Sequence, residues 1–91
     1  MTNLERLAME YAAEAHAAIN QRRKYTDEPY IVHPAGVVEL VRSVKHTEAM
    51  LCAAWLHDTV EDTGASLFEI RGIFGKEVAE MVEMLTDVST L

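Results

Sequence analysis

Residues 50–63 read MLCAAWLHDTVEDT, an apolar run followed by histidine, carboxylates and threonines. Its first seven residues, 50–56, are apolar on every side of a helix, which is typical of a helix buried at the centre of a domain. Thr47 is suited to cap this helix at its start. His57 and Asp58 follow as soon as the apolar run stops, so we expect them at the mouth of the core.

Two amphipathic helices are predicted before the central one. Apolar side chains recur every three or four residues from residue 3 to about residue 20, the period of a helix with one buried face. Polar residues 21–28 then form a loop. A second helix is expected from Pro34 to about residue 45, since proline is tolerated at the first position of a helix. Its inner stripe is formed by Val37, Val38, Val41 and Val44, while Glu39 and Arg42 face water.

Two further helices are predicted after the central one. Ser66 and Glu69 have the spacing of a capping box, in which two side chains satisfy free backbone N–H groups at a helix start. This helix ends near Gly75, and a fifth helix carries an apolar stripe at Val78, Met81, Val82 and Leu85. The sequence therefore predicts a single all-α domain over residues 1–91, a compact bundle of about five helices.

Charge and composition exclude several classes of partner. The formal net charge of −7 argues against nonspecific binding of DNA or RNA, because such binding needs basic side chains to neutralise phosphates. No apolar run approaches the roughly 20 residues that span a bilayer, and the single cysteine, Cys52, fits a reducing compartment. We therefore expect a cytoplasmic protein with no nucleic-acid partner and no membrane segment.

Ligand-type side chains gather at the end of the central helix. His57 and Asp58 offer a nitrogen and a hard oxygen donor, and Glu61 and Asp62 follow one helical turn later. If the helix continued, these four positions would lie within an arc of about 140°. His33, at the start of another helix, could meet them on one ion. Mixed histidine and carboxylate ligands suit Mn²⁺, Fe²⁺ or Zn²⁺, and a bound ion lowers the pKa of a ligating water.

Several motifs occur in order along the chain: His16, Arg23-Lys24, PYIVHP at 29–34, LHDTVEDT at 56–63 and FGKEVA at 74–79. In these motifs the chain resembles the HD-domain hydrolases of the alarmone (p)ppGpp, the RelA/SpoT-like group that includes small alarmone hydrolases. The resemblance implies a helical HD fold with one divalent metal, commonly manganese. It also implies removal of the 3′-pyrophosphate from guanosine tetra- or pentaphosphate by attack of metal-activated water.

The resemblance assigns roles to individual residues as well. The family's metal ligands match three residues of this chain: His33, His57 and Asp58. Glu61 and Asp62 match an acidic pair that acts near the metal and is a candidate for activating or orienting the water. Arg23 and Lys24 match basic residues that contact the nucleotide, although a solvated loop would have the same composition.

The chain departs from the family pattern in its last part. The family's fourth metal ligand, an aspartate on a later helix, lies past the stretch that corresponds to residues 86–89, so we expect the sequence to be either a fragment or a naturally short relative. We therefore expect apolar surface to be left uncovered and the chain to form a homo-oligomer. A partner chain could then supply a carboxylate such as Asp87 or Glu83. The alternative is a catalytically incomplete HD-like module that self-associates and at most binds metal or nucleotide weakly.

Four aromatic residues outside the proposed ligands have structural interpretations. Trp55 is expected in the core, and His46, beside Lys45, is expected in solvent. His16 either orients a neighbouring group or lies on the surface of a helix. Tyr30 either packs beneath the site, which is the interpretation we favour, or helps to shape a nucleotide pocket.

Overall fold

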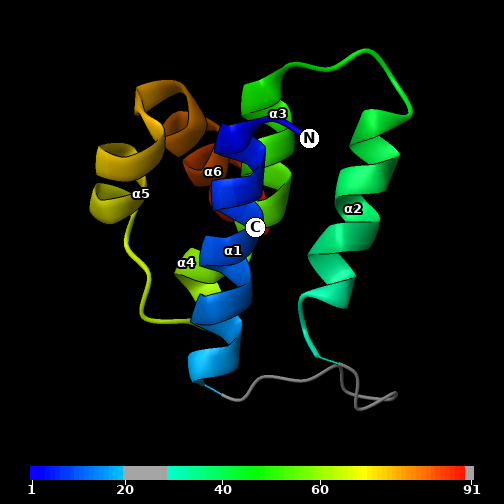
Figure 1. The fold of residues 1–91 in the computed structure, drawn as a ribbon. Helices are drawn as coiled ribbons and strands as arrows, with labels where there is room; N and C mark the ends of the chain where they lie inside the picture. Colours follow the sequence, from blue (N-terminus) through cyan, green and yellow to red (C-terminus); the bar gives the residue numbers. More distant parts are fainter. Residues whose placement is uncertain (20–28, 90–91) are drawn as a thin grey trace.

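The computed structural model describes residues 1–19 and 29–89, with side chains as far as Thr86. The helices of this part of the chain are α1 (Asn3–Ala18), α2 (Val32–Arg42), α3 (Glu48–Leu56), α4 (Thr59–Asp62), α5 (Leu67–Phe74) and α6 (Lys76–Ser89) (Figure 1). The predicted all-α fold class is therefore confirmed. None of the described helices combines the length and the apolar character needed to cross a membrane.

Side-chain caps fix where three of the helices begin. The hydroxyl groups of Thr2, Thr47 and Ser66 accept hydrogen bonds from backbone N–H groups three residues later, over 3.1–3.2 Å. Caps of this kind stabilise a helix by about 0.5–2 kcal/mol each. Gly75 ends α5 with a φ of 97°, in the region that favours glycine. The predicted caps at Thr47 and Ser66 and the predicted end near Gly75 are confirmed.

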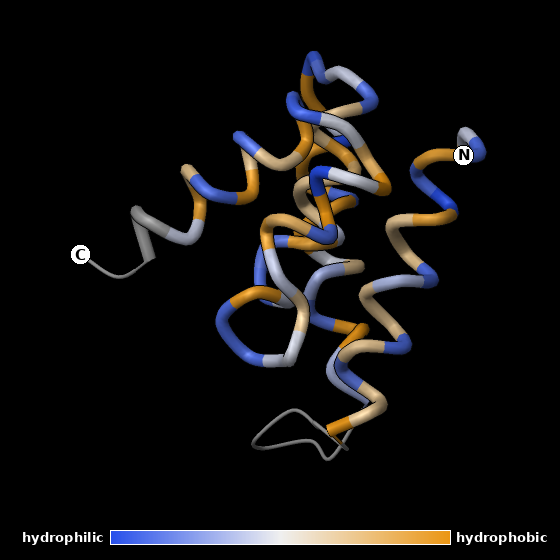
Figure 2. The backbone as a smooth tube through the Cα atoms, turned by 90° about the vertical axis from the view of Figure 1, so that its left-hand side faces the viewer, coloured by the Kyte–Doolittle hydropathy of each residue, from blue (hydrophilic) through white to orange (hydrophobic). Residues whose placement is uncertain are grey.

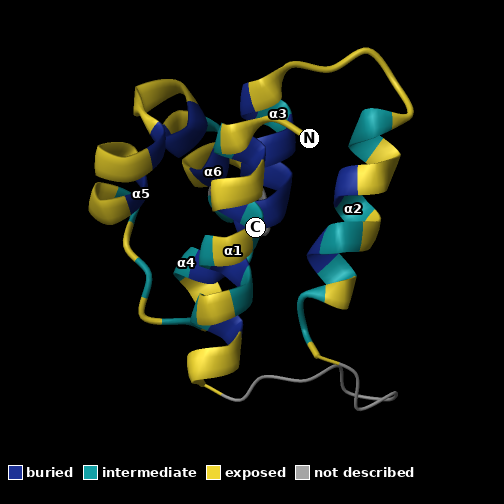
Figure 3. Ribbon diagram, viewed as in Figure 1, coloured by how far each residue is buried: buried dark blue, intermediate teal, exposed yellow. Residues whose placement is uncertain are grey.

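The central position of α3 follows from its composition. Residues 51–56 are all buried, and α3 contacts α1, α2 and α6. Figure 3 shows buried residues covering most of α3 and the faces of α1 and α2 that are turned towards it. Hydrophobic and hydrophilic residues alternate along α1, as expected of an amphipathic helix (Figure 2). Trp55 is only 5% exposed, which confirms its predicted place in the core.

The boundaries of α2 differ from the prediction. The helix begins at Val32, two residues before Pro34, and it ends at Arg42 rather than near residue 45. Val38 is fully buried, whereas Val44 lies beyond the helix end and is exposed. The predicted inner stripe therefore holds within α2 but does not extend to Val44.

The central helix also stops earlier than a continuous helix through Asp62 would require. The chain turns at His57 and Asp58 and resumes as the single-turn helix α4. Thr59 Oγ1 donates to the carbonyl of Leu56 at 2.8 Å, and His57 Nδ1 contacts the carbonyl of Ala54 at 2.7 Å. These side chains hydrogen-bond to carbonyls at the end of α3 that a continuing helix would pair with backbone N–H groups. They therefore favour the end of the helix at this point.

A buried carboxylate links α1, α2 and α3. Glu5 on α1 is 1% exposed, and both of its oxygens accept hydrogen bonds from the Arg42 guanidinium. Trp55 Nε1 also donates to Glu5 Oε2, at 3.1 Å. The hydrogen bond from Arg42 holds the pKa of Glu5 below its usual value. The prediction that Arg42 faces water holds only in part: the side chain is 32% exposed, but its guanidinium is turned to Glu5, because a buried carboxylate requires a partner.

An apolar groove runs between α2, α3 and α6. Apart from His57, its lining is hydrophobic and consists of Val37, Val41, Met50, Ala53, Ala54, Met81, Met84 and Leu85. The C-terminal part of α6 extends away from the rest of the bundle (Figure 2), and Met84 is 58% exposed. Met84 and Leu85, which is 39% exposed, thus form part of the uncovered apolar surface that we expected.

Candidate metal centre

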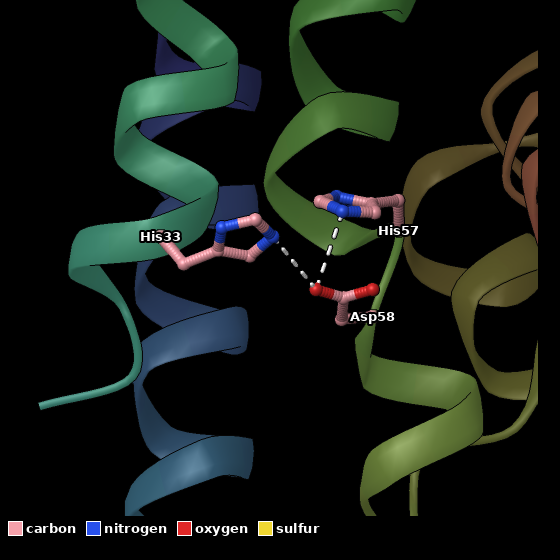
Figure 4. Close-up of side chains that lie close together, drawn as sticks. All are labelled: His33, His57 and Asp58. Carbon is pink, nitrogen blue, oxygen red and sulfur yellow. Dashed lines mark ion pairs between the residues drawn. The ribbon is translucent and has the colours of Figure 1, made fainter. Parts of the chain in front are cut away.

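Three of the predicted ligands lie together where α2 meets the break between α3 and α4. His33 comes from the first turn of α2, and His57 and Asp58 form the break itself (Figure 4). Asp58 Oδ2 lies 3.4 Å from His33 Nε2 and 3.2 Å from His57 Nε2. One ligand atom from each residue lies within 4.8 Å of the other two. The geometry therefore presents two imidazole nitrogens and a carboxylate oxygen to one point.

The contact between His57 and the backbone sets the tautomer of its ring. Because a carbonyl oxygen only accepts, the contact of His57 Nδ1 with Ala54 O requires Nδ1 to carry the proton. When the ring is protonated, Nε2–H donates to Asp58, and when the ring is neutral, the lone pair is on Nε2 and is available to a metal ion. Histidines that bind metal usually donate their other ring N–H in this way. The break in the helix thus both places His57 and orients its ligating nitrogen.

A row of ring contacts leads from α1 into the ligand set, in the order His16, Tyr30, His33 and His57. The ring of Tyr30 lies 4.5 Å from that of His16 and 5.6 Å from that of His33, measured between centroids. His16 is 1% exposed, so its interpretation as a helix-surface residue was wrong. The packing of Tyr30 beneath the site is present, and its hydroxyl also donates to Asp58 Oδ2 at 2.7 Å. We did not predict this hydrogen bond between Tyr30 and Asp58.

Charge and burial set the protonation of the site. Burial raises the pKa of Asp58, but hydrogen bonds from His57 and Tyr30 outweigh it and hold that pKa below its usual value. The hydrogen bond with Asp58 raises the pKa of His57 against the opposing effect of burial. Burial, followed by the hydrogen bond to Asp58, raises the pKa of the Tyr30 hydroxyl. Asp58 is therefore an anion at neutral pH, and Tyr30 remains a donor to it.

The donor set fits a divalent cation. The side chains of His33, His57 and Asp58 are 40%, 20% and 15% exposed, so the cluster lies at the edge of the core rather than inside it. Two imidazole nitrogens and one carboxylate suit Mn²⁺, Fe²⁺ or Zn²⁺ and leave coordination positions for water or substrate.

The other predicted site residues are placed less closely. Glu61 and Asp62 lie on α4 and are exposed, rather than continuing the helix that ends in His57. The charge of Glu61 nevertheless contributes to the raised pKa of His57, and that of Asp62 to the raised pKa of Tyr30. The acidic pair is thus part of the electrostatic surroundings of the ligands.

Three of the predicted residues lie wholly or in part outside the described residues. Arg23 and Lys24, predicted to contact nucleotide, lie outside the described residues, as does the side chain of Asp87. Glu83 is exposed on α6. His46, expected in solvent, is exposed.

Comparison with known proteins agrees with this geometry. A model of the HD domain family matches residues 8–91. The MESH1 protein of Xenopus tropicalis, named a guanosine-3′,5′-bis(diphosphate) 3′-pyrophosphohydrolase, is 46% identical over 88 residues, which cover 92% of this chain and 48% of MESH1. A Synechocystis protein named a probable enzyme of the same kind is 44% identical over 79 residues, which cover 87% of this chain and 10% of that protein.

The fold of a solved relative is similar as well. A structure described as a metazoan orthologue of SpoT that hydrolyses ppGpp superposes with a TM-score of 0.87 at 35% sequence identity. The match covers all of this chain and 52% of the relative. The chain thus spans about half the length of this structure and of MESH1, and a tenth of the Synechocystis protein.

Proposed function

The chain belongs to the HD-domain family, and on that premise we propose that it carries the metal-binding part of a phosphohydrolase of guanosine tetra- and pentaphosphate. One observation carries the proposal: His33, His57 and Asp58 direct one ligand atom each to a common point. The names of the relatives support the substrate, since two of them are called 3′-pyrophosphohydrolases of guanosine bis(diphosphate). In the proposed reaction the oxygen of water bonds to the phosphorus next to the ribose 3′ oxygen, the 3′ O–P bond breaks, and pyrophosphate and a guanosine nucleotide with a 3′ hydroxyl are released.

We propose that His33, His57 and Asp58 hold a divalent cation, with Mn²⁺ as the first candidate and Fe²⁺ or Zn²⁺ as alternatives. When bound, such an ion supplies Lewis acidity that makes a ligated water acidic near neutral pH. Asp58 contributes the negative charge of the ligand set, because its pKa is held low. His57 contributes a nitrogen oriented by the Ala54 carbonyl.

The proposed roles of the remaining residues follow from their chemistry. Glu61 and Asp62, exposed on α4 next to the ligands, are proposed to orient the attacking water and accept its proton. Arg23 and Lys24 are proposed to bind the phosphates of the nucleotide through charge-assisted hydrogen bonds. A cytoplasmic location is proposed as well, which agrees with the free and buried thiol of Cys52.

A second candidate function is supported by the apolar groove. A groove of this kind is usually covered in soluble proteins, and the chain spans only about half of MESH1. The alternative proposal is an HD-like module that self-associates through apolar surface, binds metal weakly and does not turn over substrate alone.

Two measurements separate the two proposals: the release of pyrophosphate and the binding of Mn²⁺. The purified chain is incubated with guanosine tetraphosphate and Mn²⁺, and the release of pyrophosphate is measured. Release is expected from the wild type and from His46→Ala, whose histidine is exposed, but not from Asp58→Asn. A chain that binds Mn²⁺ yet releases no pyrophosphate would contradict the hydrolase proposal and favour the incomplete module.

A further inference from the structure

We infer that Tyr30 is a positioning residue of the metal centre: its hydroxyl holds the Asp58 carboxylate in the orientation that meets both histidines. The inference rests on the proposed role of His33, His57 and Asp58 as ligands. Asp58 Oδ2, the oxygen that receives the hydroxyl at 2.7 Å, is also the oxygen nearest to both ring nitrogens. A single contact from Tyr30 therefore acts on the atom at the centre of the ligand set.

The local backbone does not orient this carboxylate. Asp58 occupies the N-cap position of α4, where an aspartate normally accepts a hydrogen bond from a nearby backbone N–H. Here the side chain makes no such cap bond, and its φ of −95° and ψ of −8° differ from the extended backbone of a usual N-cap. The carboxylate is thus turned away from its own helix and towards Tyr30 and the histidines.

Tyr30 is itself held on two sides. Its ring packs against His16, which is fully enclosed on α1. Its carbonyl accepts a hydrogen bond from His33 N at 2.9 Å, in the turn that leads into α2. Tyr30 is thus connected to one proposed ligand, His33, through the backbone of this turn. Its hydroxyl hydrogen-bonds to another proposed ligand, Asp58. The tyrosine therefore links the α2 side of the centre to the α3–α4 break.

The chain offers a matched control for the loss of such a bond. Tyr11 on α1 also donates its hydroxyl to a carboxylate, that of Glu69 on α5, and its ring packs edge-on against Phe74. Tyr11→Phe and Tyr30→Phe remove the same kind of hydrogen bond and keep both rings. Of these two hydrogen bonds, only that of Tyr30 is accepted by a proposed metal ligand.

The experiment is titration of Mn²⁺ into the apoprotein by calorimetry, with wild type, Tyr30→Phe and Tyr11→Phe compared. Loss of a group that orients a metal ligand typically weakens metal binding by about 10- to 100-fold. We expect a Kd raised by that factor in Tyr30→Phe and unchanged in Tyr11→Phe. The second measurement is the melting temperature of each variant in the presence of EDTA. We expect Tyr30→Phe and Tyr11→Phe to melt at similar temperatures. A merely structural role of Tyr30 would instead lower the melting temperature of Tyr30→Phe below that of Tyr11→Phe.

The outcomes distinguish the inference from its premise. Equal Mn²⁺ affinity in Tyr30→Phe and wild type would overturn the role of Tyr30 and leave the metal centre intact. A matching loss of affinity in Tyr11→Phe would also overturn it, since the effect would not be specific to the ligand contact. If the wild type bound no Mn²⁺, the metal centre and the inference would both be overturned.

Discussion

The break between α3 and α4 places His57 and Asp58, and it depends on the hydroxyl of Thr59. This residue is fully buried, and its Oγ1 donates to the carbonyl of Leu56 at 2.8 Å. Thr59→Val keeps the shape of the side chain and removes only the donor. A buried acceptor left without its donor costs about 1–3 kcal/mol. We therefore expect Thr59→Val to lower the free energy of unfolding by that amount.

The effect is measurable in a domain of this size. Each kcal/mol lowers the melting temperature by roughly 4–8 °C in domains of 60–100 residues. Urea unfolding, followed by circular dichroism, gives the free energy directly. We also expect weaker Mn²⁺ binding in Thr59→Val, because the turn that carries two proposed ligands loses one of the bonds that fix it.

Thr86→Val is the matched control for this prediction. Thr86 Oγ1 donates to the Val82 carbonyl at 2.9 Å, but within the continuous helix α6. Carbonyls inside a helix also accept a backbone N–H, so loss of the hydroxyl should change stability by less than about 0.5 kcal/mol. If Thr59→Val were as stable as this control and bound Mn²⁺ as tightly as wild type, the explanation of the break would be refuted.

Two further predictions concern the core. The pKa of Glu5 is lowered by its hydrogen bond from Arg42, so its contribution to stability is complete above the unfolded value of about 4.3 and is lost as pH falls through the lower folded pKa. The stability difference between wild type and Glu5→Gln in urea should therefore shrink between pH 6 and pH 3, and a constant difference would contradict this assignment. Leu56→Ala, at a fully buried position, should cost about 2–5 kcal/mol. Phe68→Ala, at a position that is 89% exposed, should cost little in the same urea experiment, and equal costs would contradict the central place of α3.

The sequence predicted the features that depend on local pattern. The all-round apolar character of residues 50–56 identified the central helix, and Thr47 and Ser66 identified two helix starts. The clustering of His33 with His57 and Asp58 was also expected, because both histidines were assigned to helix ends. Their binding of metal and the action of Glu61 and Asp62 stay predictions.

Features that depend on pairing between distant residues could not be predicted in this way. Arg42 and Glu5 are 37 positions apart in sequence. Helical periodicity does not indicate which charged side chains on two different helices will pair across the core. The hydroxyl contact of Tyr30 with Asp58 spans 28 positions and has the same limitation. The end of α3 near His57 was expected from the end of the apolar run, but the side-chain bonds from His57 and Thr59 to α3 carbonyls that accompany it were not.

The central claim is that His33, His57 and Asp58 form one divalent metal site. Anomalous diffraction from crystals grown with Mn²⁺ tests it most directly, because the signal locates the ion itself. We predict one strong anomalous peak per chain, within bonding distance of His33 Nε2, His57 Nε2 and a carboxylate oxygen of Asp58. The peak should be absent from Asp58→Asn crystals grown in the same way. The absence of a peak at these three residues, whether or not Mn²⁺ gives a peak at another place, would contradict the claim.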